Sequence, residues 1–61
     1  MIEFAEGDVV AEIGDPEKWI IEGFTYGFAW LESLDDGRIM NVERDHFDET
    51  WIVLEGKDER V

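Results

Sequence analysis

The apolar residues of this chain come in short runs, and each run ends at residues that form turns. No segment of ten or more residues keeps a period of about 3.6, so the pattern favours strands over helices. Glycine, aspartate and proline mark the breaks, as GDPE at 14–17 and DDG at 35–37. These residue types supply the backbone geometry of tight turns. The sequence therefore predicts an all-β fold of short strands.

Five strands are predicted, at Val9–Ile13, Lys18–Glu22, Phe28–Leu34, Arg38–Val42 and Trp51–Leu54. We expect a loop over Gly23–Gly27, and a single helical or 3₁₀ turn over the polar segment Glu43–Phe47, before the last strand.

Side chains alternate between the two faces of a strand. Trp19 should therefore share a face with Ile21, Ala29 with Leu31, and Trp51 with Val53. Because a barrel has one interior, we expect several of the large apolar side chains to be partly exposed. The candidates are Ile20, Phe28, Trp30 and Trp51.

The chain has 61 residues and no cysteine. We expect one domain over 1–55 and a charged C-terminal tail over 56–61, because so short a chain supports a single core. Without cysteine there is no disulfide, no thiolate nucleophile and no thiolate ligand for zinc. No apolar run approaches the ~18 residues of a membrane span, and the N-terminus lacks the basic start of a signal peptide. We predict a cytoplasmic protein that is a monomer or a weak homodimer.

Most of the chain, from about Phe4 to Leu54, resembles the SH3-like superfamily of small β-barrels. The resemblance lies in FAEGDVV at 4–10, WII at 19–21 and DDGR at 35–38. It implies a five-stranded SH3-like barrel with one short helical turn before the last strand. Closing a sheet into a barrel also removes its exposed edges. An OB-type barrel is the structural alternative, although it usually needs more residues.

The charge of the chain constrains its partners. Seventeen acidic residues against five basic ones give a net charge of −12. This surface repels nucleic acid and anionic membranes, so we expect no direct contact with either. It attracts basic proteins. A net charge of about 2–8 is enough to keep a small domain soluble, so the excess indicates a basic partner.

We therefore predict a noncatalytic module that binds a basic protein, with aromatic side chains as anchors and carboxylates that steer the partner. The predicted partner-binding residues are Trp19, Phe28, Trp30, Asp35, Asp36, Asp45, Asp48 and Glu49. In composition the chain is similar to small phage-encoded inhibitors that mimic DNA. That similarity implies that the partner is a nucleic-acid-binding protein blocked by the acidic surface.

Two alternatives remain open. The segments GDVVA at 7–11 and FAW at 28–30 are similar to those of Tudor-like members of the superfamily. Such a resemblance implies an aromatic cage for methylated lysine or arginine, held by cation–π attraction. Its candidate walls are Trp19, Tyr26, Phe28 and Trp30, with Asp35 or Asp36 as the counter-charge. The second alternative is a structural module whose exposed aromatic side chains pair with another copy.

Catalysis and metal binding find less support in the sequence. The chain has one histidine, and its position suggests no serine–histidine–acid arrangement. The turns at 14–16 and 56–58 place acids where a phosphate would bind. The segment DHFDE at 45–49 gathers carboxylates beside the histidine, but its spacing matches no calcium loop. We favour a solvated turn anchored by Phe47, and predict no enzyme activity, cofactor or metal.

Overall fold

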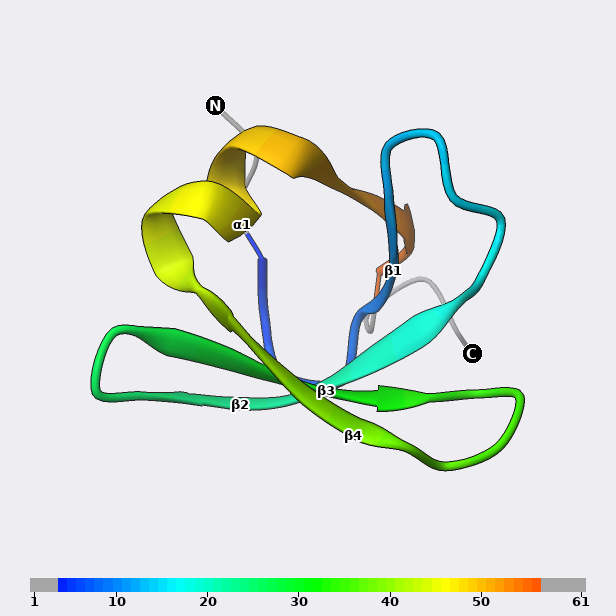
Figure 1. Ribbon diagram of the computed structural model, residues 1–61, viewed down its shortest axis with the longest axis horizontal. Helices are drawn as coiled ribbons and strands as arrows, with labels where there is room; N and C mark the ends of the chain where they lie inside the picture. The colour runs from blue at the N-terminus through cyan, green and yellow to red at the C-terminus, as the bar shows by residue number, and fades with distance from the viewer. Residues whose placement is uncertain (1–3, 57–61) are drawn as a thin grey trace.

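The computed structural model describes residues 4–56. It contains β1 (Val9–Glu12), β2 (Trp19–Thr25), β3 (Phe28–Ser33), β4 (Ile39–Glu43), α1 (Arg44–Thr50) and β5 (Trp51–Glu55) (Figure 1). The strands form one antiparallel sheet in the order β4-β3-β2-β1-β5. The predicted tail over 56–61 lies almost wholly outside the described residues.

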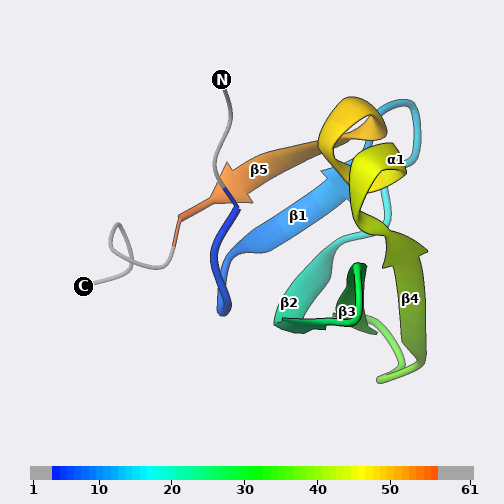
Figure 2. The same ribbon diagram turned by 90° about the vertical axis from the view of Figure 1, so that its left-hand side faces the viewer.

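The prediction of an all-β fold with five strands and one short helix is confirmed. Barrel closure is not shown: β4 and β5 are the two edges of an open sheet, and they do not pair within residues 4–56. The sheet curls strongly, and α1 lies on the side toward which it curls (Figure 2). The buried side chains of the core lie between the sheet and α1.

The predicted loop over Gly23–Gly27 is wrong in its first part. Strand β2 continues to Thr25, because a bulge between Ile21 and Gly23 lets the strand keep pairing with β3. The connection to β3 is only Tyr26-Gly27, and both residues have positive φ, 53° and 79°. Two central residues with positive φ are typical of a type I′ hairpin turn.

The predicted helical turn at Glu43–Phe47 is a seven-residue α-helix, α1, that begins one residue later. No side chain caps its N-terminus. Instead the backbone N–H of Arg44 donates to the carbonyl oxygen of Gly27 at 2.8 Å. The helix therefore starts against the β2–β3 turn. Among the described residues no helix has the length and apolar character needed to cross a membrane.

Phe47 of α1 is the centre of the core and is fully buried. Its ring centroid lies 4.4 Å from that of Phe4 and 5.5 Å from that of Trp51. Trp51 packs edge-on against Trp19, at 6.4 Å between centroids. The aromatic rings thus join α1 to β5 and β2.

The inner face of the sheet has the predicted alternation. Trp19 and Ile21 are buried together, as are Ala29 and Leu31. Of the four side chains offered as partly exposed, Trp51 is buried, because it lies between Phe47 and Trp19. Phe28 and Trp30 are partly exposed, and Ile20 is half-buried.

Candidate functional site

The structure divides the predicted partner-binding residues among separate places. Trp19 lies in the core with 6% of its surface exposed, so it offers no open ring face. Asp35 and Asp36 lie in the β3–β4 turn, whereas Asp45, Asp48 and Glu49 lie on α1. These two acidic groups are therefore at opposite ends of β4, which runs between them (Figure 1).

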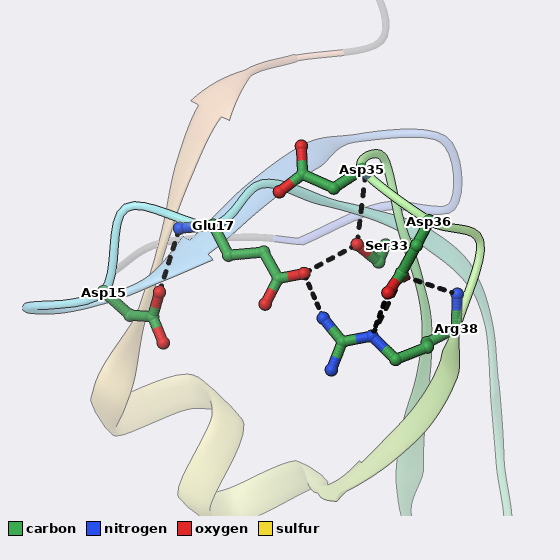
Figure 3. A network of polar contacts seen from close by, with 6 residues as sticks. All are labelled: Asp15, Glu17, Ser33, Asp35, Asp36 and Arg38. Carbon is green, nitrogen blue, oxygen red and sulfur yellow. Dashed lines mark hydrogen bonds and ion pairs between the residues drawn. The ribbon is translucent and has the colours of Figure 1, made fainter.

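The acids at the β3–β4 turn belong to a network centred on Arg38 (Figure 3). The Arg38 guanidinium forms ion pairs with Asp36, at 2.7 Å, and with Glu17 of the β1–β2 loop. It also lies 5.4 Å from the Trp19 ring centroid. The Ser33 hydroxyl donates to Glu17 at 2.7 Å. This network ties the β3–β4 turn to the β1–β2 loop.

Hydrogen bonds from the side chain and backbone of Arg38 hold the pKa of Asp36 below its ordinary value. A depressed carboxyl pKa stabilises the fold above the unfolded-state pKa, and this contribution is lost as the pH falls through the folded-state pKa. Asp36 is thus engaged in holding the turn, whereas Asp35 contributes its backbone N–H, which donates to the Ser33 hydroxyl.

The other end of the β2–β3 hairpin carries two adjoining shallow pockets, which we call the hairpin-end pocket. One has a volume of about 170 Å³ and the other about 350 Å³. Their lining residues are Phe24, Thr25, Tyr26, Gly27, Phe28, Glu43, Arg44 and Asp45. Of the predicted partner-binding residues, Phe28 and Asp45 come together here. Tyr26, a predicted cage residue, joins them.

Tyr26 combines an unfavourable backbone conformation with almost complete exposure to solvent. Its side chain is 97% exposed, and its φ of 53° lies in the left-handed region. That region costs an ordinary L-residue roughly 1–2 kcal/mol, while glycine and asparagine adopt it readily. Neither burial nor backbone preference explains a tyrosine at this position. A residue that conflicts with its local conformation without a gain in packing is a candidate functional residue.

Arg44 forms one wall of the hairpin-end pocket. Its guanidinium carbon lies 4.2 Å from the Phe24 ring centroid, which is a cation–π contact. Its Nε donates to Asp48 at 3.1 Å, so Asp48 is paired within α1. The neighbouring acids, Glu43 and Asp45, are exposed. The pocket therefore presents aromatic surface beside two exposed carboxylates.

Trp30 lies next to the pocket and does not line it. Its indole Nε1 donates to the Thr25 hydroxyl at 2.6 Å, which holds the ring over the outer face of the hairpin. With 36% of its surface exposed, it extends the aromatic area that Phe28 (38%) begins. A partner that covered Tyr26 and Phe28 would reach Trp30 along β3.

Glu22 of β2 and Glu32 of β3 form a carboxyl pair farther along the outer face. A hydrogen bond that the protonated Glu22 carboxyl donates to Glu32 is the largest cause that raises the pKa of Glu22 above its ordinary value of 4.5, followed by desolvation and by the charges of Glu32 and Glu6. Repulsion between two carboxylates favours the protonated form of one of them. The pair therefore opposes folding when both groups are ionised.

Replacing Glu22 by glutamine should give a small rise in Tm at about pH 7, because it removes this repulsion. A raised carboxyl pKa means stability that is present below the unfolded-state pKa and lost as the pH rises through the folded-state pKa. The gain should accordingly disappear at a pH well below the unfolded-state pKa, where Glu22 is protonated in both states. Thermal unfolding followed by circular dichroism checks both values. Glu12→Gln removes the same charge elsewhere, and an equal rise in Tm for both variants would contradict the pairing.

Within residues 4–56, no group of three or more histidine and acidic side chains is placed to hold a metal ion. His46, Asp45 and Glu49 lie on α1, while Phe47 between them points into the core. The segment is part of a seven-residue helix rather than a solvated turn, and Phe47 anchors it in the core as expected.

Sequence reasoning missed Phe24 and Arg44 as parts of the site. Phe24 was placed in a loop, and Arg44 was counted only as one of five bases. The contact between them joins residues 20 positions apart, from β2 and α1. The available signal was the Tyr26-Gly27 pair between two apolar runs, which is a variant of the Asn-Gly hairpin signature.

No protein-family model, curated protein or solved structure matches this chain. Function is therefore argued from the chain's own residues.

Proposed function

We propose that this protein is a noncatalytic, cytoplasmic acidic module, with its strands in the arrangement of an SH3-like barrel, that binds a basic partner protein through the hairpin-end pocket. The conformation and exposure of Tyr26 are the observation that carries this proposal. A nearly fully exposed tyrosine adopts the left-handed region at a cost to the fold, and it lines the same pocket as Phe28 and Asp45.

The two kinds of side chain have different tasks in this mechanism. Carboxylates act at long range and accelerate the encounter with a positive surface. Aromatic rings act at contact, because tyrosine and phenylalanine bury a large area with few rotatable bonds. Lysine or arginine side chains of the partner would stack on Tyr26 and Phe28 and pair with Glu43 and Asp45. The Arg44 charge opposes this binding little, since Asp48 and the Phe24 ring engage it.

The partner class that we propose is a nucleic-acid-binding protein, which the acidic surface inhibits by imitating DNA, as phage-encoded inhibitors do. The support is the charge. A net value of −12 on 61 residues is a high density of negative charge, and two of the five bases, Arg38 and Arg44, form ion pairs with the protein's own carboxylates. A surface that binds nucleic acid is positively charged, so it attracts a ligand with negative charge.

Two charge reversals at opposite ends of β4 test the proposal. The immobilised protein is used to capture basic proteins from lysate of its own cells, and a captured protein is then measured by surface plasmon resonance. Asp45→Lys should slow association several-fold at low salt, because it reverses a charge at the hairpin-end pocket. Asp35→Lys makes the same change of net charge in the β3–β4 turn and should slow association less.

High salt should remove the difference between these variants, and duplex DNA should compete with the protein for its partner. Equal association rates for the two variants would place the contact elsewhere on the surface. A partner that DNA does not displace would contradict DNA mimicry, while leaving the binding module in place.

A reader of methylated lysine or arginine is the second candidate. Three aromatic side chains, those of Phe24, Tyr26 and Phe28, line the smaller pocket. Arg44 already covers Phe24, which leaves Tyr26 and Phe28 as the open rings of a partial cage. Calorimetric titration with a lysine-containing peptide in methylated and unmodified forms separates the candidates. A reader prefers the methylated form, whereas an acidic docking module binds both alike.

A further inference from the structure

A second apolar surface lies on the outer face of β1 and β5, away from the hairpin-end pocket. A groove of about 490 Å³ follows it. Its lining residues, which together define the β5 groove, are Ala11, Glu12, Ile13, Gly14, Asp15, Pro16, Ile52 and Leu54. Ile13 is 62% exposed, Ile52 37% and Leu54 46%. Three large aliphatic side chains are therefore open to solvent in one place.

The local pairing explains why these side chains meet. Ala11 of β1 lies opposite Ile52 of β5, so the two share the outer face of the sheet. Ile13 follows two residues after Ala11, and its backbone N–H donates to the Thr50 carbonyl oxygen at 2.8 Å. Leu54 follows two residues after Ile52, and the side-chain period of two keeps it on the same face. The groove is a regular product of the strand pairing.

The groove runs beside an open edge of the sheet. Strand β5 is the last in the order β4-β3-β2-β1-β5, and within residues 4–56 it pairs only with β1. Such an edge is a template for a further strand, and natural proteins usually protect it with lysine, proline or a covering segment. The sequence of β5, WIVLE, contains neither lysine nor proline. Its β-branched and aromatic residues favour an extended partner.

Charge decides what kind of segment the groove accepts. Glu12 and Asp15 line the groove, and no basic residue is among its described lining residues. A second copy of the chain would bring the same acidic rim and a net charge of −12 against it. A partner segment with lysine or arginine would meet opposite charge at the same positions.

We propose that the β5 edge and groove bind an extended basic segment of a partner protein by strand addition. The segment alternates apolar residues with lysine or arginine. Its backbone hydrogen-bonds along β5, its apolar side chains extend the outer face beside Ile52 and Leu54, and its basic side chains are attracted by the acidic rim to which Glu12 and Asp15 contribute. Strand addition derives affinity from main-chain hydrogen bonds and specificity from the alternate side chains. This surface is separate from the hairpin-end pocket, so an experiment can contradict one binding proposal without contradicting the other.

The test uses the full chain and a synthetic peptide of seven residues, Lys-Val-Lys-Ile-Lys-Val-Lys. Binding should slow amide hydrogen exchange of Val53, read by NMR, because its N–H points to the free edge whereas that of Ile52 points to Ala11 of β1. Leu54→Lys should raise the Kd at least about tenfold, because it places a like charge in the groove. Ile13→Lys provides the same measurement at a more exposed position, where folding is least disturbed. Asn41→Lys, which adds the same charge on the exposed part of β4 outside both surfaces, should leave this Kd nearly unchanged.

A second peptide, with proline in place of both valines, keeps the charge but cannot form the strand ladder. It should bind at least about tenfold more weakly. Equal binding of the two peptides would overturn strand addition, since charge alone would then account for affinity. Exchange that slows at the β2–β3 turn and not in β5 would also overturn it. Protection of β5 that grows with protein concentration in the absence of peptide would assign the groove to a second copy instead.

Discussion

Replacing Phe47 by alanine should unfold most of the protein at room temperature. A buried phenylalanine truncated to alanine typically costs 3–5 kcal/mol of the free energy of unfolding. A core of this size rarely supplies more than about 3–5 kcal/mol in total. Phe47 is fully buried and contacts the rings of Phe4, Phe24 and Trp51, which come from separate parts of the chain.

Urea unfolding followed by tryptophan fluorescence measures the change. Phe28→Ala serves as the control, because it removes the same side chain from a position that is 38% exposed. It should retain the fold and lose less than half as much stability. A Phe47→Ala protein with near-native stability would mean that α1 contributes little to the core, and that the helix is not what positions Arg44 at the hairpin-end pocket.

Replacing Tyr26 by asparagine should raise stability and weaken partner binding at once. Asparagine adopts the left-handed conformation more readily than tyrosine, and Asn-Gly is the preferred pair in a type I′ turn. The expected gain is about 1 kcal/mol in the free energy of unfolding. The loss of an exposed aromatic anchor should weaken binding of the basic partner by about 2 kcal/mol, which is roughly 30-fold in Kd.

This opposite movement distinguishes a functional residue from a structural one. Chemical denaturation gives the stability, and surface plasmon resonance with the captured partner gives the Kd. Tyr26→Phe keeps the ring at the same backbone cost, so it should bind nearly as well as the original chain and gain no stability. If the asparagine variant binds with unchanged Kd, Tyr26 is not a binding residue. The proposal that the hairpin-end pocket is the binding site then loses its main support.

The alternation of side chains was predictable because it follows from the backbone geometry of consecutive residues within one strand. Trp19 with Ile21 and Ala29 with Leu31 were assigned to shared faces from the period of two alone, and each pair is buried together. The extent of β2 was not predictable in the same way. The glycine at Gly23 favours a loop locally, and only pairing with Trp30 across a bulge keeps it in the strand.

Which aromatic side chains remain exposed depends on packing neighbours that are distant in the sequence. Trp51 is buried because Phe47 and Trp19 lie on either side of it, whereas Trp30 lies on the outer face, bonded to Thr25. All three tryptophans occupy short strands of similar composition. Their burial follows from the curl of the sheet and the place of α1, which arise only when distant segments pack.

The sequence by itself determined the strand-rich fold class, the short helix before the last strand, the face that each strand presents and the strong negative charge. These depend on residue type and on neighbours a few positions away. The tertiary structure alone decided that Phe28, Tyr26 and Asp45 share a pocket, while Asp35 and Asp36 lie at the other end of β4. The physical reason is that α1 folds back onto the β2–β3 turn. The backbone hydrogen bond from Arg44 to Gly27 and the contact of the Arg44 guanidinium with the Phe24 ring form only after the sheet has brought those residues together.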